Sequence, residues 1–194
     1  SSNGLVERIF GKQINRNSFG IWRINGTDDF IYSNRNWAIA GNLIKPGGNI
    51  GSGTGINKTS NLSPNGNLFP IFQGGTLTVD QDNQTYTQNF TLNSSKDNAI
   101  NNNGYSVKFS GIFSDAPGES GNITFRPNAN FIEISGKNTY TGRTIVNGNG
   151  TLVSRNGAIP NSSDVYLLSP NSQLAILGDE IIASLRSTQG TATV

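Results

Sequence analysis

The chain has 194 residues, of which 34% are hydrophobic, 13% are charged and 24 are glycine, and its net charge is +2. The charged share lies well below the usual value of about 25%, and neutral Asn, Ser, Thr and Gly take its place, a composition typical of β surfaces and turns and poor for helices. The chain contains no Cys and no His, which excludes disulfides, thiolate or imidazole metal sites, and a Ser-His-Asp triad within it.

The charges form no basic patch, because 14 basic residues are nearly balanced by 12 acidic ones. Nucleic acid is therefore not an expected partner. The sequence shows no signal peptide and no long apolar span. It begins Ser1-Ser2-Asn3-Gly4 and ends in a predicted strand, Thr191-Ala192-Thr193-Val194, so we expect a piece of a longer protein.

The N-terminal part combines one ambiguous segment with several predicted strands. Between Gly4 and Gln13, the apolar residues Leu5, Val6, Ile9 and Phe10 have the spacing of a short helix or turn, and a first strand is the alternative because the segment is short. Strands are predicted at 19–24, 30–32 and 37–40, and the Asn25-Gly26 dipeptide predicts a turn after the first of them.

Both tryptophans of the chain lie in these early strands. Trp22 and Trp37 either fill a wide β core or form an exposed aromatic platform together with Tyr32 and Arg35. Trp, Tyr and Arg are enriched in binding hot spots, and such a platform could stack on sugars or on a protein partner. Trp22, Tyr32, Arg35 and Trp37 are therefore the candidate binding residues.

The stretch 45–67 is rich in glycine, proline and serine and predicts loops. A phosphate-binding P-loop requires Gly-x4-Gly-Lys-Ser/Thr between a strand and a helix. Lys58-Thr59 follows Asn57, so the spacing fails, and no helical pattern comes after it. We expect a surface loop here rather than a nucleotide site.

From Gly74 onwards, apolar and polar residues alternate in short segments separated by turns. The alternation is found at 76–79, 90–92, 107–109 and 123–125, and Leu152, Val165, Leu174, Ile182 and Val194 continue it. This recurrence fits coil repeats of roughly 20–30 residues, in which each coil buries its apolar face against its neighbours. A pair of β-hairpins in a sandwich is the alternative that the periodicity leaves open.

Acidic pairs offer the few candidates for catalysis or metal binding. We place Asp28-Asp29 and Asp179-Glu180 in turns, and nothing in the sequence sets two acids at a working separation. Asp80 and Asp82, with Asn83 as a weak further ligand, could hold calcium, but a polar turn is the simpler interpretation. We therefore predict no enzyme activity, no metal and no cofactor.

The central motif of the chain is the segment Gly136–Gly142 (GKNTYTG), which follows a predicted strand at 131–135. The predicted structural turn residues are Asn138, Tyr140, Gly142, Gly148 and Gly150. We expect the glycines to supply positive φ angles and Asn and Thr side chains to form ladders between equivalent positions of neighbouring coils. Tyr140 is interpreted as a packed side chain.

The motif also carries a family resemblance. The pattern Gly136-x-Asn138-Thr139-Tyr140-Thr141-Gly142-x-Thr144-x-Val146, followed by Gly150-Thr151-Leu152, resembles the autotransporter-associated β-strand repeat of bacterial passenger domains. Downstream, 157–167, 173–176 and 182–194 are similar to later elements of that repeat, and 105–112 to the run before it. The run departs from the family pattern after Ile112, where Phe113-Ser114 replaces the expected glycine.

The resemblance implies a fold and a route of export. It implies an all-β, right-handed parallel β-helix (solenoid), with coils over residues 74–194 and an N-terminal cap or loop-rich β region over residues 1–73. It also implies a secreted or cell-surface location, reached through an outer-membrane translocator barrel in the same precursor.

The expected function is adhesion or self-association from a rigid stalk, with a host-cell, matrix or sister-cell surface component as partner. A toxin or enzyme passenger with its active part elsewhere, a phage receptor-binding fibre and, outside the family, a β-sandwich lectin are the alternatives.

Overall fold

The structure is a computed structural model, which describes residues 7–9, 12–16, 21–24, 28–33, 36–40, 49–51, 58–62, 70–94 and 97–188, with side chains at residue 50 and from 58 onwards within these ranges. The chain divides into two compact units, residues 1–47 and 48–194. The second unit includes strands that precede Gly74, so its coils begin earlier than the division at residues 73 and 74 that the sequence suggested.

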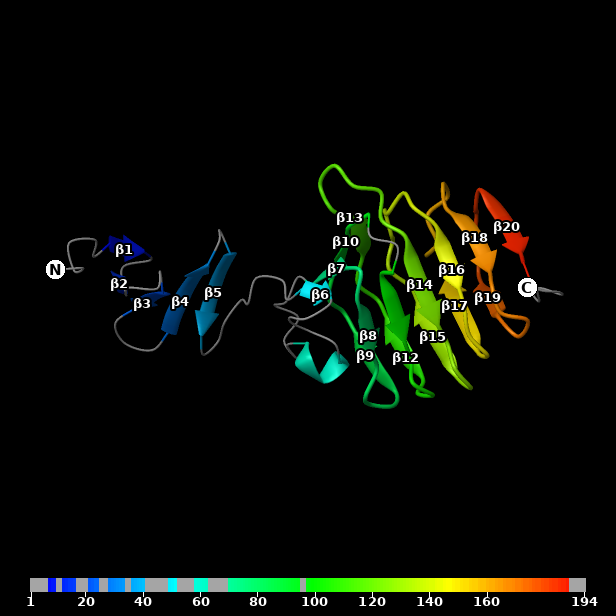
Figure 1. The fold of residues 1–194 in the computed structure, drawn as a ribbon, viewed down its shortest axis with the longest axis horizontal. Coiled ribbons are helices and arrows are strands. Elements are labelled where there is room, and N and C mark those ends of the chain that lie inside the picture. Colours follow the sequence, from blue (N-terminus) through cyan, green and yellow to red (C-terminus); the bar gives the residue numbers. More distant parts are fainter. Residues whose placement is uncertain are drawn as a thin grey trace. The chain divides into compact units, whose positions relative to one another are not determined.

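The first unit is an antiparallel sheet of five strands in sequential order (Figure 1). Its strands are β1 (Glu7–Ile9), β2 (Lys12–Arg16), β3 (Ile21–Ile24), β4 (Asp28–Ser33) and β5 (Asn36–Ala40). For the described residues of the segment 4–13, the strand is correct and the helix is wrong, because Glu7 pairs with Ile14 in a β1–β2 ladder. Pairing gives these backbone groups partners, whereas a single helical turn leaves most of them unpaired.

In its described residues, the second unit consists of short parallel strands and the 3-10 helix η2 (Thr59–Asn61). The four-stranded sheet contains β6 (Asn49–Gly51), β7 (Ile71–Gln73), β10 (Phe90–Leu92) and β13 (Phe113–Asp115). The six-stranded sheet contains β8 (Thr76–Thr78), β11 (Ala99–Asn101), β14 (Ile123–Arg126), β16 (Thr144–Val146), β18 (Asp164–Leu167) and β20 (Ser184–Ser187). The five-stranded parallel sheet contains β9 (Gln84–Tyr86), β12 (Val107–Phe109), β15 (Phe131–Ile134), β17 (Thr151–Arg155) and β19 (Gln173–Leu177).

These strands build a β-solenoid of about five coils, which confirms the expected parallel β-helix. Strands that are consecutive within a sheet pair in parallel, as in the register Val107 with Ile132 and Ile132 with Leu152. The parallel ladders contradict the sandwich of hairpins for this unit. Hydrogen bonds between neighbouring coils join residues 24 or 26 apart, within the predicted repeat length. The right-handed sense of the coil stays a prediction.

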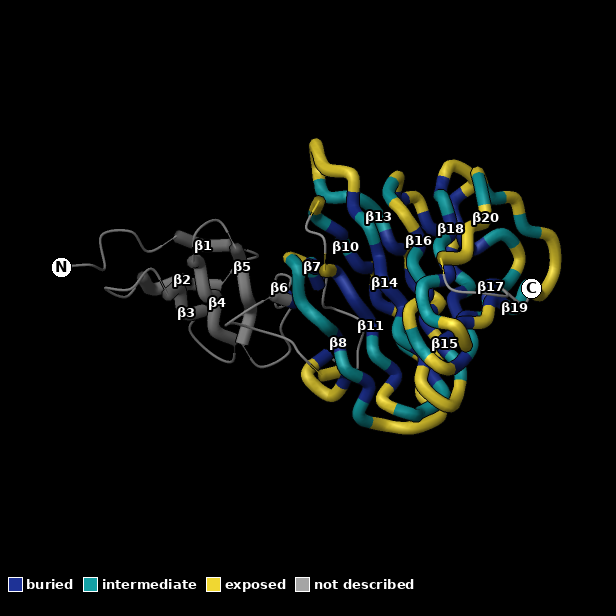
Figure 2. Tube along the Cα trace, turned by 45° about the vertical axis from the view of Figure 1, so that its right-hand side comes forward, coloured by how far each residue is buried: buried dark blue, intermediate teal, exposed yellow. Residues whose placement is uncertain are grey.

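The interior of the solenoid is apolar, and exposure is concentrated in the turns between strands (Figure 2). In the first coils the interior contains an aromatic stack: Phe90 lies against Phe113 with 4.8 Å between ring centroids, the spacing of hydrogen-bonded strands. Phe72 continues the stack at 5.6 Å from Phe90. Because the spacing of neighbouring coils is close to the distance at which aromatic rings pack, phenylalanines of successive coils contact each other in the interior.

Buried asparagines connect each coil to both of its neighbours. Asn98 accepts a hydrogen bond from the Gly74 amide at 2.9 Å and donates one to the Asn122 carbonyl at 3.1 Å. Asn138 similarly accepts from the Phe113 amide and donates to the Ala158 carbonyl, both at 2.8 Å. The ladders predicted between Asn side chains are thus replaced, at these positions, by side-chain contacts to backbone groups. The side-chain amide of asparagine carries both an acceptor oxygen and N–H donors. One residue can therefore pair with a backbone N–H and a backbone C=O in a turn where no β-ladder pairs them.

The Gly136–Gly142 segment lies between β15 and β16 and runs beside β13. The Thr139 amide donates to the Phe113 carbonyl at 2.9 Å, and the Thr141 amide donates to the Asp115 carboxylate. The motif therefore occupies the side of the coil on which the preceding coils place a strand of the four-stranded sheet. It connects two strands, as predicted, and in addition forms one whole side of its coil.

The glycines of this region are required for space and not for a positive φ. Positive φ angles occur at other glycines of the described chain, and not at Gly142, Gly148 or Gly150. A Cβ atom at Gly142 would lie 2.2 Å from the Gly121 carbonyl oxygen, and the other two glycines face backbone oxygens at 2.0 and 2.3 Å. The prediction of positive φ is wrong. These positions require glycine because the backbone of the adjacent coil leaves no space for a Cβ atom, and the residues of that coil are distant in the sequence.

Candidate binding site

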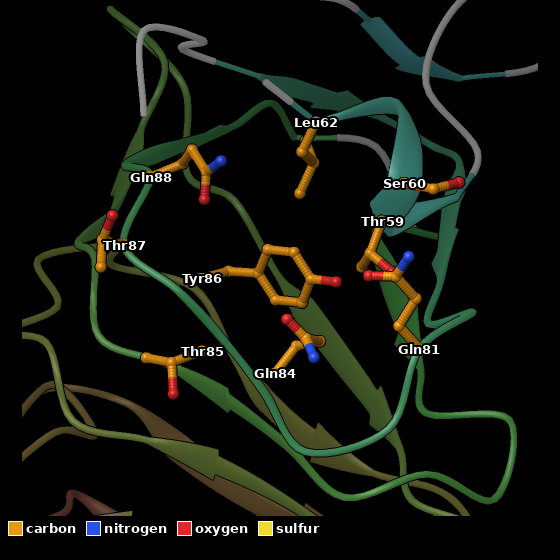
Figure 3. A pocket seen from close by; sticks show the side chains of 9 residues that line it. All are labelled: Thr59, Ser60, Leu62, Gln81, Gln84, Thr85, Tyr86, Thr87 and Gln88. Carbon is orange, nitrogen blue, oxygen red and sulfur yellow. The ribbon is translucent and has the colours of Figure 1, made fainter. Parts of the chain in front are cut away.

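The candidate site is a pocket beside Tyr86, between η2 and the segment 81–88 (Figure 3). It has a volume of about 310 Å³, at the lower end of the usual range for small-molecule sites, about 300–1,000 Å³. Its walls are Thr59, Ser60, Leu62, Gln81, Gln84, Thr85, Tyr86, Thr87 and Gln88. No charged side chain is among these residues, so the pocket offers hydroxyl groups, amides and one aromatic ring.

An acidic residue behind the pocket fixes the position of η2. The Asp80 carboxylate accepts hydrogen bonds from the Thr59 hydroxyl at 2.8 Å, from the Ser60 amide at 3.0 Å and from the Ser60 hydroxyl. Lys58, at the start of η2, forms a parallel bridge with Thr78 at the end of β8. These contacts hold Thr59 and Ser60 on the wall of the pocket.

The same contacts keep the Asp80 carboxyl ionised. The pKa of Asp80 is lowered below its ordinary value of 3.8, chiefly because the Ser60 hydroxyl donates a hydrogen bond to the carboxylate. Desolvation opposes this effect, and hydrogen bonds from the Thr59 hydroxyl and from backbone amides add to it. A carboxylate with this many protein donors is a poor general acid or base near neutral pH. Asp80 therefore acts as a structural clamp for the pocket.

Tyr86 provides the aromatic surface of the pocket. Its ring is partly buried and stacks on Phe109 at 5.5 Å between centroids, with an angle of 27° between the planes. Burial raises the pKa of Tyr86, against the effect of a hydrogen bond with Thr59, so the hydroxyl stays protonated. Figure 3 shows the ring in the middle of the lining residues, with the hydroxyl directed toward Thr59.

The pocket also borders a sheet edge. In the described part of the chain, β9 is the terminal strand of the five-stranded parallel sheet and pairs with β12 alone. Edge strands present backbone N–H and C=O groups in addition to their side chains. Residues 84–88 can thus contribute main-chain hydrogen bonds to a ligand.

Three of the four predicted binding residues lie in the antiparallel sheet of the first unit. Trp22 belongs to β3 and is in register with Phe30, whereas Tyr32 of β4 is in register with Trp37 of β5. The pairing brings Tyr32 and Trp37 to adjacent positions. Arg35 lies outside the described residues, as does the Asn25-Gly26 turn.

The predicted turn residue Tyr140 is fully buried, in agreement with its interpretation as a packed side chain. Its hydroxyl lies 2.6 Å from the Thr144 hydroxyl, which in turn lies 2.8 Å from the Ser163 hydroxyl. Ser163 donates to the Gly142 carbonyl at 2.8 Å. Burial raises the pKa of Tyr140 far above its usual range. This closed network has no access for a ligand.

Several acidic residues that the sequence offered as catalytic or calcium-binding candidates accept hydrogen bonds from the protein or lie in a strand. Asp82 accepts a hydrogen bond from the Ser106 amide at 2.9 Å, and Glu180 accepts one from the Ser154 hydroxyl. Asp28 and Asp29 begin β4, so their predicted placement in a turn is wrong; pairing with β3 extends the strand to them. Among the described residues, no three acidic side chains come together as a metal site.

The sequence did not single out the pocket as a whole. The signal was present, since the run Gln81–Gln88 places glutamines and threonines around Tyr86, but the sequence suggested only a calcium site here, with Asp80, Asp82 and Asn83 as ligands. In the described part of the chain, every helix is too short or too polar to cross a membrane. Comparisons of the chain with protein-family models, curated proteins and solved structures give no match.

Proposed function

We propose that the chain is a non-enzymatic, adhesive segment of a secreted or surface-displayed passenger, and that the pocket beside Tyr86 binds an uncharged saccharide of a host-cell, matrix or sister-cell surface. The observation that carries the proposal is the pocket lining, which combines one aromatic ring with neutral hydrogen-bonding side chains. Sugars present both apolar C–H faces and hydroxyl groups, and such a lining complements both.

The solenoid supports this role in two further ways. Parallel coils give a rigid platform on which a site keeps its shape, because each strand is held by the coil before and the coil after it. Asp80, whose carboxylate is bonded to two residues of the pocket wall, is held by Thr59 and Ser60, which favours binding over acid–base chemistry. The resemblance of 136–146 to the autotransporter repeat supplies the proposed route to the cell surface and the translocator barrel in the precursor.

The pocket is tested with the 194-residue protein and a panel of immobilised neutral oligosaccharides: cellotetraose, maltotetraose and N-acetyllactosamine. We expect at least one of them to bind, and the double variant Tyr86→Phe/Gln84→Ala to weaken that binding about tenfold, because two hydrogen-bonding groups are removed. The matched control is Gln173→Ala, which truncates an exposed glutamine of the same sheet away from the pocket.

The adhesive role is tested with beads that carry the protein and are exposed to host cells, matrix and bacteria of the same kind. Binding that survives in the control and is lost in the pocket variant supports the proposal. A protein that binds none of these surfaces, with a precursor whose cytotoxicity disappears on deletion of the segment, would favour the toxin passenger instead.

Self-association is the second candidate, favoured by exposed apolar side chains near β19 and β20. Ile181 is 65% exposed, Leu177 43% and Leu185 39%. Sedimentation velocity of the wild type and of Ile181→Asn tests it. A dimer that the substitution converts to monomer supports self-association through this surface, whereas a concentration-independent monomer in both proteins contradicts it.

A further inference from the structure

A second group of aromatic and charged side chains lies on the six-stranded sheet, away from the pocket residues. Along β18, buried Val165 and Leu167 alternate with the partly exposed Asp164 and Tyr166. Tyr166 is in register with Ile145 of β16 and with Arg186 of β20. The ring of Tyr166 therefore belongs to the outer face of the sheet, with one coil on either side of it.

Two arginines approach this ring from the neighbouring coils. The guanidinium carbon of Arg143, just before β16, lies 5.0 Å from the ring centroid of Tyr166, and that of Arg186 lies 5.7 Å from it. Both distances fall within the cation–π range of about 6 Å. One tyrosine ring thus holds two exposed positive charges in place.

Neither of these guanidinium groups has an acidic partner at ion-pair distance in the described part of the chain. Asp164, the adjacent carboxylate, accepts a hydrogen bond from the Ser184 hydroxyl. The five-stranded parallel sheet offers the contrast: Arg155 binds Glu133 with contacts of 3.0 and 3.2 Å, and Lys108 lies 3.8 Å from the same carboxylate. On that sheet each of these cations lies beside a carboxylate, whereas the two arginines beside Tyr166 have none at ion-pair distance.

We infer that Arg143, Tyr166 and Arg186 form an anion-binding site for an acidic polysaccharide, whose sulfate or carboxylate groups accept hydrogen bonds from the two guanidinium groups. Among the described residues, neither guanidinium group donates a hydrogen bond to a protein acceptor, so their N–H donors are available to a ligand, and the planar fork of arginine matches such oxyanions. The ring contacts also reduce the conformational entropy that the arginines would lose on binding.

The surroundings favour a polysaccharide over a nucleic acid. The exposed Asn147 and the partly exposed Ser169, joined by a hydrogen bond of 2.7 Å, lie just beyond β16 and β18 and can bind sugar hydroxyl groups. Two arginines within a chain of net charge +2 form too small a basic surface for the many phosphate contacts on which binding to nucleic acid depends. The inference does not rest on the proposed function, since it concerns other residues and a charged ligand.

The test is titration of the 194-residue protein with dextran sulfate and with unsulfated dextran of the same length. We expect binding to dextran sulfate alone, weakened by added salt because exposed charges are screened. The double variant Arg143→Gln/Arg186→Gln should bind about tenfold more weakly. The matched double variant Lys108→Gln/Lys137→Gln removes the same charge elsewhere on the solenoid and should stay within about twofold of the wild type.

Two further measurements keep the test decisive. Tyr166→Phe retains the ring and should retain affinity, whereas Tyr166→Leu should lose much of it while thermal unfolding shows an intact fold. Equal loss of affinity in the two double variants would overturn the site, because binding would then follow net charge alone. Tighter binding of a thymidine oligonucleotide or of polyglutamate than of dextran sulfate would overturn the choice of a polysaccharide.

Discussion

Two tyrosines of the solenoid allow a comparison between a side chain that serves structure and one that lines the proposed binding pocket. Tyr140, in the Gly136–Gly142 motif, is fully buried and its hydroxyl is bonded to Thr144. Tyr86 is partly buried, stacks on Phe109 and borders a pocket of neutral polar residues. The most recognisable motif of the sequence therefore holds the coils together, and the less conspicuous Gln- and Thr-rich segment provides the candidate site.

The largest effect in the motif region is expected for Gly142→Ala. The added Cβ would lie 2.2 Å from the Gly121 carbonyl oxygen, so two coils must move apart. We expect a loss of about 3 kcal/mol in the free energy of unfolding, measured by urea denaturation. An unchanged stability would show that the backbone of the two coils adapts freely and that the close approach is not a constraint.

Asn138→Ala is the next largest expected change. It leaves the Phe113 amide and the Ala158 carbonyl without their bonds of 2.8 Å, at a cost of about 2 kcal/mol. The neighbouring, exposed Thr139 provides the control, since Thr139→Ala should alter the free energy of unfolding by less than about 0.5 kcal/mol. Similar effects of both substitutions would contradict the role of Asn138 as a connection between coils.

Removal of the two tyrosine hydroxyl groups compares the regions directly. Tyr140→Phe deprives the buried Thr144 hydroxyl of one partner and should cost about 1 kcal/mol. Tyr86→Phe should cost less, because its hydroxyl borders an open pocket, and should instead reduce affinity for the saccharide. A larger loss of stability for Tyr86→Phe than for Tyr140→Phe would reverse the assignment of roles.

The smallest expected effect is a pH dependence of the protein's stability that arises from Asp80. The pKa of Asp80 is lowered in the folded state, chiefly by the hydrogen bond from the Ser60 hydroxyl. The ionised carboxylate therefore stabilises the fold at pH values above the ordinary pKa of Asp. This contribution is lost as the pH falls through the pKa that Asp80 has in the folded protein. Asp80→Asn should therefore destabilise the protein more at pH 7 than at about pH 2.5. Denaturation curves at both values measure the difference, and equal effects at both would contradict the clamp.

The sequence predicted much of the solenoid and little of the site. Strands with clear alternation, such as 90–92 and 107–109, coincide with β10 and β12, because their apolar residues face a continuous core. β9 and β11 were missed: Gln84–Tyr86 is polar at a sheet edge, and in Ala99–Asn101 two buried residues, Ala99 and Ile100, follow each other, so apolar and polar residues do not alternate.

The residues of the two proposed sites escaped prediction for a related reason. Thr59 and Gln84 come together only because Asp80 anchors η2 to the next turn of the chain, a contact that local patterns do not encode. Likewise, Arg143 and Arg186 meet at Tyr166 through coil stacking. Pairings of this kind depend on the number of residues in each coil, which varies along the chain.

The central claim, that the pocket beside Tyr86 binds an uncharged saccharide, is tested most directly by NMR. Backbone amide resonances of the 194-residue protein would be followed while cellotetraose, maltotetraose or N-acetyllactosamine is added. We expect saturable shifts confined to residues 59–62 and 81–88, with no change around Tyr140. Shifts centred on Trp22, Tyr32 and Trp37, or no saturable shift with any of the three sugars, would contradict it.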